Sequence, residues 1–122
     1  MSRKADLARL ERITSYIDDI LTIVDRHGSI DDTLGDMEGQ YAVMLCLTQI
    51  GEQLGKIREP SFVAQLPVRM AGGLRNIIVH DYEGVEMTIV GNTISKSLPE
   101  LKTIIRMLLD AETTQNEQRK PD

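Results

Sequence analysis

Aromatic side chains are scarce in this chain, whose 122 residues include one Phe, three Tyr and no Trp. A core must therefore be built from Leu, Ile, Val and Met, which suits packed helices. The single cysteine, Cys46, excludes an internal disulfide and a cysteine-based zinc site, and its place in an apolar stretch predicts a buried thiol. With 14 Lys and Arg against 19 Asp and Glu, the net charge of −5 argues against a protein that coats nucleic acid. It is compatible with an enzyme that contacts a few phosphates in one cleft.

The first part of the chain predicts two long helices. Between about Lys4 and His27, apolar residues recur every three or four positions, and Gly28 is the expected stop because it can adopt a positive φ. We expect His27 to interact with this helix end rather than with a metal. A second helix is predicted from about Met37 to Arg58, capped by Asp36. The candidates for its inner face are Tyr41, Met44, Leu45, Thr48, Leu54 and Ile57.

The remainder predicts shorter helices. Pro60 and Pro67 bracket a short helical segment, another helix begins near Val68, and a final helix begins around Val85 to Thr88 and must absorb Pro99. No strand pattern, repeat or Gly-rich phosphate loop is present. The expected fold is all-α, an up-and-down bundle of four to five helices.

We expect residues 1–111 to form a single helical domain. Residues 112–122 contain no apolar side chain that could join a core, so a polar, disordered tail is predicted there. Neither a signal peptide nor an apolar run long enough to cross a membrane is found in the sequence. The sequence therefore predicts a cytoplasmic protein with no membrane partner.

Five side chains suited to chemistry lie between Gly72 and Gly84, namely Arg75, Asn76, His80, Asp81 and Tyr82. Arginine is a permanent planar cation that suits a phosphate, and histidine, with an unperturbed pKa of ~6.5, can move protons at neutral pH. Together Arg75 and His80 could bind a phosphodiester and transfer its protons. The nearby cations could extend a basic patch around such a cleft or be ordinary solvated charges. They are Lys56, Arg58 and Arg69.

Arg75 and His80 would not share one face of a regular helix, because five positions at ~100° per residue separate them by about 140°. Either the helix ends before His80, as Gly84 would allow, or the two side chains meet across a symmetric interface with a second copy. Arg75 and Tyr82, seven positions apart, nearly share a face.

The spacing Arg75-x4-His80-x-Tyr82, preceded by Gly-Leu and followed by Glu-Gly-Val, resembles the signature of HepT-like toxins, small all-helical proteins of the HEPN superfamily. Two further blocks resemble the same family. One runs from Tyr41 to Ile57 and contains an Ile-Gly-Glu element, and the other runs from Leu98 to Leu109. The resemblance therefore covers most of the chain between the first helix and the tail.

This resemblance implies a HEPN-like bundle that forms a symmetric dimer and is the toxin of a toxin–antitoxin system. The implied activity is a metal-independent RNA endonuclease with no cofactor, in which Arg75 and His80 are catalytic. The implied partners are an RNA substrate, such as tRNA or mRNA, and a MntA-like nucleotidyltransferase antitoxin that neutralises the toxin by AMPylation of Tyr82. The hydrogen-bonding groups of the other two side chains suggest supporting roles. Asn76 could orient the substrate or His80, and Asp81 could steer the imidazole or cap the helix end.

Each of these residues also has an ordinary structural interpretation. Arg75 could be a surface ion-pair partner, His80 a structural histidine, and Tyr82 a half-buried ring with a bonded hydroxyl. The chain could then be a catalytically silent helical module that docks a nucleotidyltransferase, which the acidic net charge makes easier to accept. It could also be a purely structural helical oligomer. The module would form a complex without cutting RNA, and in the oligomer Arg75→Ala would change only the melting temperature.

Overall fold

The computed structural model describes residues 3–67, 70, 73–74 and 87–119. Every regular element in these ranges is a helix, which confirms the predicted all-α class. The helices are α1 (Arg3–His27), α2 (Ile30–Gly35), α3 (Met37–Lys56), α4 (Pro60–Val63), α6 (Met87–Asn92), η2 (Thr93–Ser97, a π-helix) and α7 (Leu98–Arg119). None of the described helices is long and apolar enough to cross a membrane.

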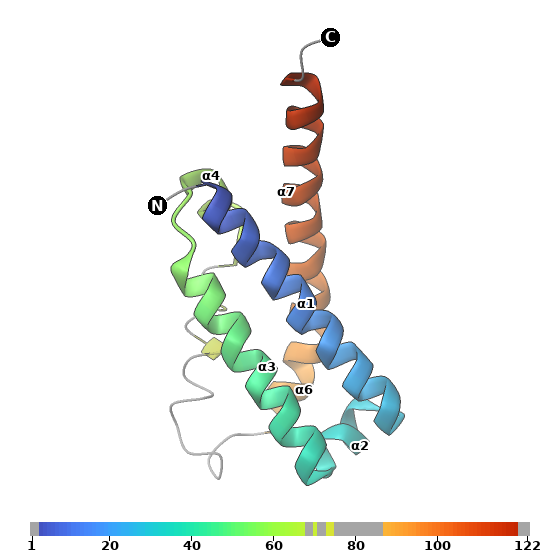
Figure 1. Cartoon of the computed structure of the whole chain (residues 1–122). Coiled ribbons are helices and arrows are strands. Elements are labelled where there is room, and N and C mark those ends of the chain that lie inside the picture. Colours follow the sequence, from blue (N-terminus) through green and yellow to red (C-terminus); the bar gives the residue numbers. More distant parts are fainter. Residues whose placement is uncertain (1–2, 68–69, 71–72, 75–86, 120–122) are drawn as a thin grey trace.

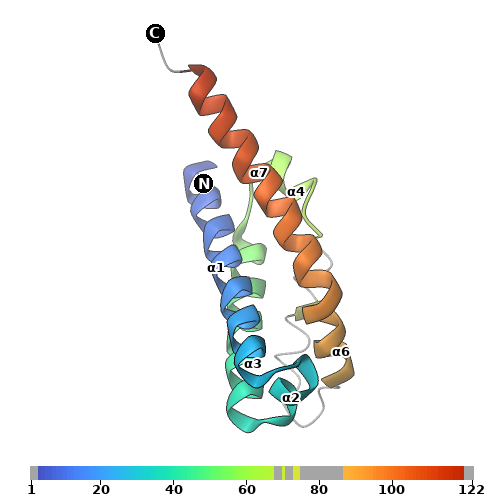
Figure 2. The same cartoon turned by 90° about the vertical axis from the view of Figure 1, so that its right-hand side faces the viewer.

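Three columns of helix make up the part of the bundle that the structure describes. Helices α1 and α3 lie side by side along most of their length, and the short helix α2 joins them at one end (Figures 1 and 2). Helices α6, η2 and α7 follow one another as the third column, which packs against α1 through α7 and against α2 through α6. The end of α7 projects past the N-terminal end of α1 (Figure 1).

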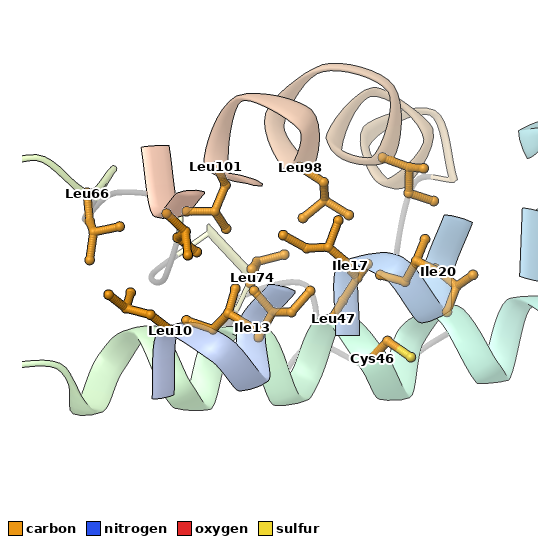
Figure 3. Close-up of a cluster of buried hydrophobic side chains, with 14 of the residues drawn as sticks. Leu10, Ile13, Ile17, Ile20, Cys46, Leu47, Leu66, Leu74, Leu98 and Leu101 are labelled. Atoms are coloured by element: carbon orange, nitrogen blue, oxygen red, sulfur yellow. The ribbon is translucent and has the colours of Figure 1, made fainter. Parts of the chain in front are cut away.

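The core is aliphatic, as the lack of aromatic residues predicted. Helix α1 contributes four of the apolar residues that recur every three or four positions, Leu10, Ile13, Ile17 and Ile20, which we call the α1 stripe. Each is at most 1% exposed, so the predicted inner face of this helix is confirmed. Figure 3 shows these side chains facing Leu98 and Leu101 of α7. Cys46 belongs to the same cluster, as predicted. Burial raises the pKa of its thiol, with a smaller contribution from the negative charge of Asp19.

The inner face of α3 was predicted only in part. Met44 and Ile57 are buried, but Tyr41 and Leu45 are 56% and 62% exposed, so their assignment to the core was wrong. Helix α3 instead packs through the neighbouring face, which is formed by Val43, Met44, Leu47 and Ile50. Apolar residues occupy well over half of the helix circumference between Tyr41 and Ile50, so the sequence does not single out one stripe.

The connection from α1 to α3 is compact. Gly28 ends α1 with a φ of 95°, as predicted, and Asp36 caps α3 by accepting a hydrogen bond of 2.8 Å from the Gly39 N–H. Gly39 also permits the close approach of α2, because a Cβ atom there would lie 2.5 Å from the Thr33 carbonyl oxygen. The three helices therefore meet at a junction that leaves no room for a side chain at position 39.

Pro99 is accommodated by a change of helix type. The Leu98 N–H donates to the Thr93 carbonyl, a bond that spans five residues and makes η2 a π-helical turn. Proline lacks an N–H and its ring clashes with the carbonyl four residues earlier in a regular helix. The wider turn just before Pro99 relieves that conflict, so the chain continues into α7.

The structure differs from the predicted tail between residues 112 and 119, which continue α7. Helix-favouring Glu, Gln and Arg residues make up five of the eight positions of this stretch. Its start is also tied down, since the Arg3 Nε donates to Glu112 Oε1 at 2.7 Å. Residues 120–122 lie outside the described part of the chain.

Candidate active site

The five predicted site residues, Arg75, Asn76, His80, Asp81 and Tyr82, lie outside the residues that the structure describes. The described residues form the frame on either side of them. Four parts of this frame bear on the site: the core position before it, the helix after it, the elbow between α3 and α4, and a pocket between α2 and α6.

The chain reaches the candidate site from inside the core. Leu74, which directly precedes Arg75, is 2% exposed and lies among the side chains of α1 and α7 (Figure 3). Met70, one turn earlier, packs partly buried against the same cluster. Met70 and Leu74 belong to the apolar side expected of the helix that begins near Val68, and the structure confirms their burial, whereas Ile77 and Ile78 of the same side lie outside the described residues.

The chain leaves the candidate site at α6. Met87, the first residue of this helix, receives a hydrogen bond of 3.2 Å on its sulfur from Gln40 Nε2, which also donates to the Leu34 carbonyl at 3.3 Å. Val90 is fully buried in the core. The residues on both sides of the candidate site are therefore held by packing, which is the support that a precise site requires.

The elbow between α3 and α4 is fixed by Asp6, a residue that the sequence did not single out. This side chain is 1% exposed, and its Oδ2 accepts main-chain hydrogen bonds from Arg58 N at 2.9 Å and Glu59 N at 2.8 Å. Its Oδ1 accepts from Arg9 Nη1 at 2.7 Å. Burial opposes ionisation, but the hydrogen bonds from these donors outweigh it and hold the pKa of Asp6 below its ordinary value.

One member of the possible basic patch has a structural role. The Arg58 guanidinium donates from Nη1 to the carbonyls of Gly55 at 2.7 Å and Ile57 at 3.1 Å, so it satisfies acceptors at the end of α3. Lys56 is exposed beside it. Arg69 and Arg75 lie outside the described residues.

His27 interacts with the end of α1, as predicted. Its Nδ1 lies 2.8 Å from the Ile23 carbonyl and its Nε2 lies 3.2 Å from Asp36 Oδ2. The bond to Ile23 is the main cause of the raised pKa of the imidazole; burial opposes it, and the Asp36 carboxylate adds to the rise. The Gly39 N–H and then His27 lower the pKa of Asp36. The Asp36 carboxylate is therefore the cap of α3, as predicted.

A pocket of about 440 Å³ lies between α2 and the α6–η2 column. Five of its eight described lining residues have polar side chains, and the lining comprises Ser29, Ile30, Asp31, Met87, Thr88, Gly91, Asn92 and Ser95. The pocket begins five residues after Tyr82 in the sequence, at Met87. Sequence analysis missed it because its two walls come from segments that are more than fifty positions apart.

The described part of the chain is an all-helical bundle, and the sequence contains the Arg75-x4-His80-x-Tyr82 spacing. The chain belongs to the Ribonuclease HepT-like family, whose family model matches residues 10–108. This confirms the resemblance to HepT-like proteins that the three sequence blocks indicated. All five candidate site residues lie within the matched range.

Similar proteins span nearly the same length as this chain. "Putative RNase MJ0125" of Methanocaldococcus jannaschii is 30% identical over 106 residues, which cover 84% of this chain and 89% of that protein. "Putative RNase MJ1216" of the same organism is 29% identical over 106 residues, covering 84% and 85%. "Probable ribonuclease HepT" of Thermococcus cleftensis is 27% identical over 95 residues, covering 71% and 86%. No solved structure matches the chain significantly.

Proposed function

We propose that this protein is a metal-independent RNA endonuclease and the toxin of a toxin–antitoxin pair. The observation that carries the proposal is the match to the Ribonuclease HepT-like family over residues 10–108, a range that contains the Arg75-x4-His80-x-Tyr82 motif. Relatives that this chain covers to 85–89% of their own length carry the name RNase. We expect its substrate to be RNA such as tRNA or mRNA, and its location to be the cytoplasm.

The chemistry uses the nucleophile that RNA itself supplies. A base removes the proton of the 2′-hydroxyl, an acid protonates the departing 5′-oxygen, and a cation stabilises the negative charge that builds up on the phosphate. We assign the proton transfers to His80 and the stabilisation of the phosphate to Arg75. Asn76 orients the substrate or His80, and Asp81 steers the imidazole.

Two features of the described frame support this assignment. Leu74 is buried directly before Arg75, and Met87 is fixed by Gln40 shortly after Tyr82, so the segment with the motif starts and ends at packed positions. Residues on a packed frame can be held in the orientation that proton transfer requires. Arg75 and His80 are too far apart around a regular helix to act together on one face, so we propose a symmetric dimer in which both protomers contribute to one cleft.

Regulation by a nucleotidyltransferase antitoxin has a direct physical explanation. AMP on the Tyr82 hydroxyl adds bulk and negative charge two positions from His80. The added group fills the cleft and repels the RNA backbone, as a phosphate would at the same place.

The acidic net charge of −5 favours a second candidate function, a silent helical module that docks the nucleotidyltransferase. An overall negative protein gains no general attraction to RNA. The ribonuclease therefore needs local cations, and the module does not. The two functions differ in a simple assay, because the module binds its partner and leaves RNA intact.

The decisive test measures RNA cleavage in excess chelator by the wild-type protein and two variants. One is His80→Ala, and the other is the control Asp25→Asn, which changes an exposed residue of α1. We expect fragments with cyclic-phosphate ends from the wild type and the control, and a loss of at least ~100-fold in His80→Ala, the usual contribution of an acid–base group. Equal rates in wild type and His80→Ala would refute the assignment. A folded, unmodified wild type that leaves total RNA and tRNA intact would support the binding module instead.

Tyr82→Phe tests the regulation separately. This variant lacks only the hydroxyl that accepts AMP, so we expect it to cut RNA and to stay active after treatment with the antitoxin and ATP. Intact mass should show added AMP on the wild type and none on the variant. Inactivation of Tyr82→Phe together with added AMP would place the modification on another residue.

A further inference from the structure

The pocket between α2 and α6 has the composition of a site that recognises a base. We propose that it is a nucleobase subsite for the RNA substrate and that it selects bases with an exocyclic amino group over uracil. The inference rests on the proposed ribonuclease function and adds substrate selection to it.

The size and surface of the pocket suit part of a nucleotide. Its volume of about 440 Å³ lies in the range of ~300–1,000 Å³ that is usual for small-ligand sites. Ile30 and Met87 offer apolar surface to the flat face of a base. Gly91 also lines the pocket, and a methyl group added there would make ordinary contacts of 3.7 Å with Ile30 Cγ2 and 3.9 Å with Leu34 Cδ1.

Two polar side chains of the lining are available to a ligand. Asp31 and Asn92 make no side-chain hydrogen bond or ion pair with any other residue that the structure describes. The hydroxyls of Ser29 and Ser95 are partly engaged, since Ser29 Oγ accepts from Asp32 N at 3.0 Å and Ser95 Oγ donates to the Asn92 carbonyl at 3.4 Å. Asp31 and Asn92 are therefore the residues that we expect to read the ligand.

The charge of the described lining disfavours an anion as the ligand. Among the described residues of the lining, Asp31 is the single charged one, and it is negative. A phosphate or a carboxylate would meet a carboxylate with no lysine or arginine from the described lining beside it. A neutral base with hydrogen-bond donors on its edge meets an acceptor instead.

The carboxylate also sets which bases fit. An ionised aspartate can only accept hydrogen bonds, so it pairs with the amino groups of adenine, cytosine or guanine. Uracil presents one N–H flanked by two carbonyl oxygens, and these oxygens are repelled by Asp31. The amide of Asn92 both donates and accepts, so it can complete the pairing with any of the three amino-bearing bases.

The subsite lies within reach of the proposed reaction centre. Met87 follows His80 by seven residues, and seven residues of fully extended chain span at most ~25 Å. The base that is read therefore belongs to a nucleotide close to the cleaved bond. A preference at one position near the cut is the expected signature.

The test measures binding and cleavage separately. For binding, fluorescence anisotropy is recorded with short 2′-O-methyl oligonucleotides, which cannot be cleaved, in a series that changes one position at a time to uridine. We expect wild type to lose about tenfold in affinity when the read position is uridine, the scale of one good base-edge contact. Asp31→Asn should remove this loss, because an amide can also donate a hydrogen bond to uracil. Asn92→Ala should weaken the binding of adenine, cytosine and guanine at the read position. Asp25→Asn, an exposed acid on α1, is the matched control and should behave as wild type.

Cleavage sites in unmodified RNA are then mapped by sequencing the fragments. Wild type should disfavour uridine at one position near the cut, and Asp31→Asn should lose that bias while it still cleaves. Discrimination in binding without any cleavage would support the subsite and refute the proposed ribonuclease function. Cleavage with the same base preference and rate in wild type, Asp31→Asn and Asn92→Ala would refute the subsite and leave the ribonuclease function in place. Loss of the bias in Asp25→Asn as well would also overturn the subsite, since the effect would then be one of net charge.

Discussion

Asp6 gives the sharpest test of how the frame of the candidate site is held. One carboxylate, buried in the first turns of α1, binds two consecutive main-chain N–H groups at the α3–α4 elbow, from Arg58 and Glu59. Replacing it with alanine leaves both donors without this acceptor. Hydrogen bonds to a charged group contribute ~1.5–3 kcal/mol each, and removal of one partner from a buried charged network costs about 3–5 kcal/mol.

We therefore expect Asp6→Ala to lower the free energy of unfolding by about 3–5 kcal/mol, a large share of the ~5–15 kcal/mol that is typical of a domain. For a chain of this size, the corresponding fall in melting temperature is on the order of 12–20 °C. Asp6→Asn keeps the shape and one acceptor oxygen, so a smaller loss of about 1–3 kcal/mol is expected. Chemical denaturation followed by circular dichroism measures both.

The matched control is Asp18→Asn. Asp18 forms an ion pair of 2.5 Å with Lys102, but its side chain is 52% exposed, so we expect a change below about 1 kcal/mol. The pH dependence separates the charge of Asp6 from its shape. Its pKa is lowered in the fold, so the advantage of wild type over Asp6→Asn should be complete above the unfolded pKa of ~3.9 and disappear as the pH falls through the lower folded pKa. Equal losses in Asp6→Asn and Asp18→Asn would refute the reasoning.

Three further predictions concern the rest of the frame. The pKa of His27 is raised in the fold, so its pairing with Asp36 stabilises the protein fully below the unfolded pKa of ~6.5. This stabilisation is lost as the pH rises through the folded pKa. His27→Gln should therefore lower the melting temperature more at pH 5.5 than at pH 9. Gly39→Ala should lower the free energy of unfolding by about 1–3 kcal/mol, because its Cβ would lie 2.5 Å from a carbonyl oxygen of α2. In the control Gly35→Ala, the added Cβ meets no atom within 4 Å, so the free energy of unfolding should change by less than about 1 kcal/mol. Chemical denaturation measures both. Burial raises the pKa of the Cys46 thiol, so iodoacetamide should label it much more slowly in the native protein than in urea, and equal rates by mass spectrometry would contradict a buried thiol.

Regular patterns within one helix could be predicted from the sequence. The α1 stripe has one clear period, and its buried residues are those that the spacing indicates. The face of α3 could not be chosen in the same way, because Tyr41 and Leu45 continue an apolar surface that runs around the helix and only the position of α1 decides which part is buried. Asp6 looked like an ordinary first-turn acid, since its partners lie 52 and 53 positions away.

The candidate site also combines features of local sequence with features that depend on tertiary packing. The five motif residues fall within eight consecutive positions, so their chemistry could be recognised from the sequence alone. The pocket between α2 and α6 forms only because these two helices pack together, which brings Asp31 and Asn92 into one lining. That packing depends in turn on the short α1–α3 connection, where Gly28 turns the chain and Gly39 admits α2. In the proposed mechanism, the residues that react are encoded locally, whereas the residues that select a substrate are brought together by tertiary packing. It follows that substitutions at the α2–α3 junction should change which base is preferred before they change the chemistry of the cut.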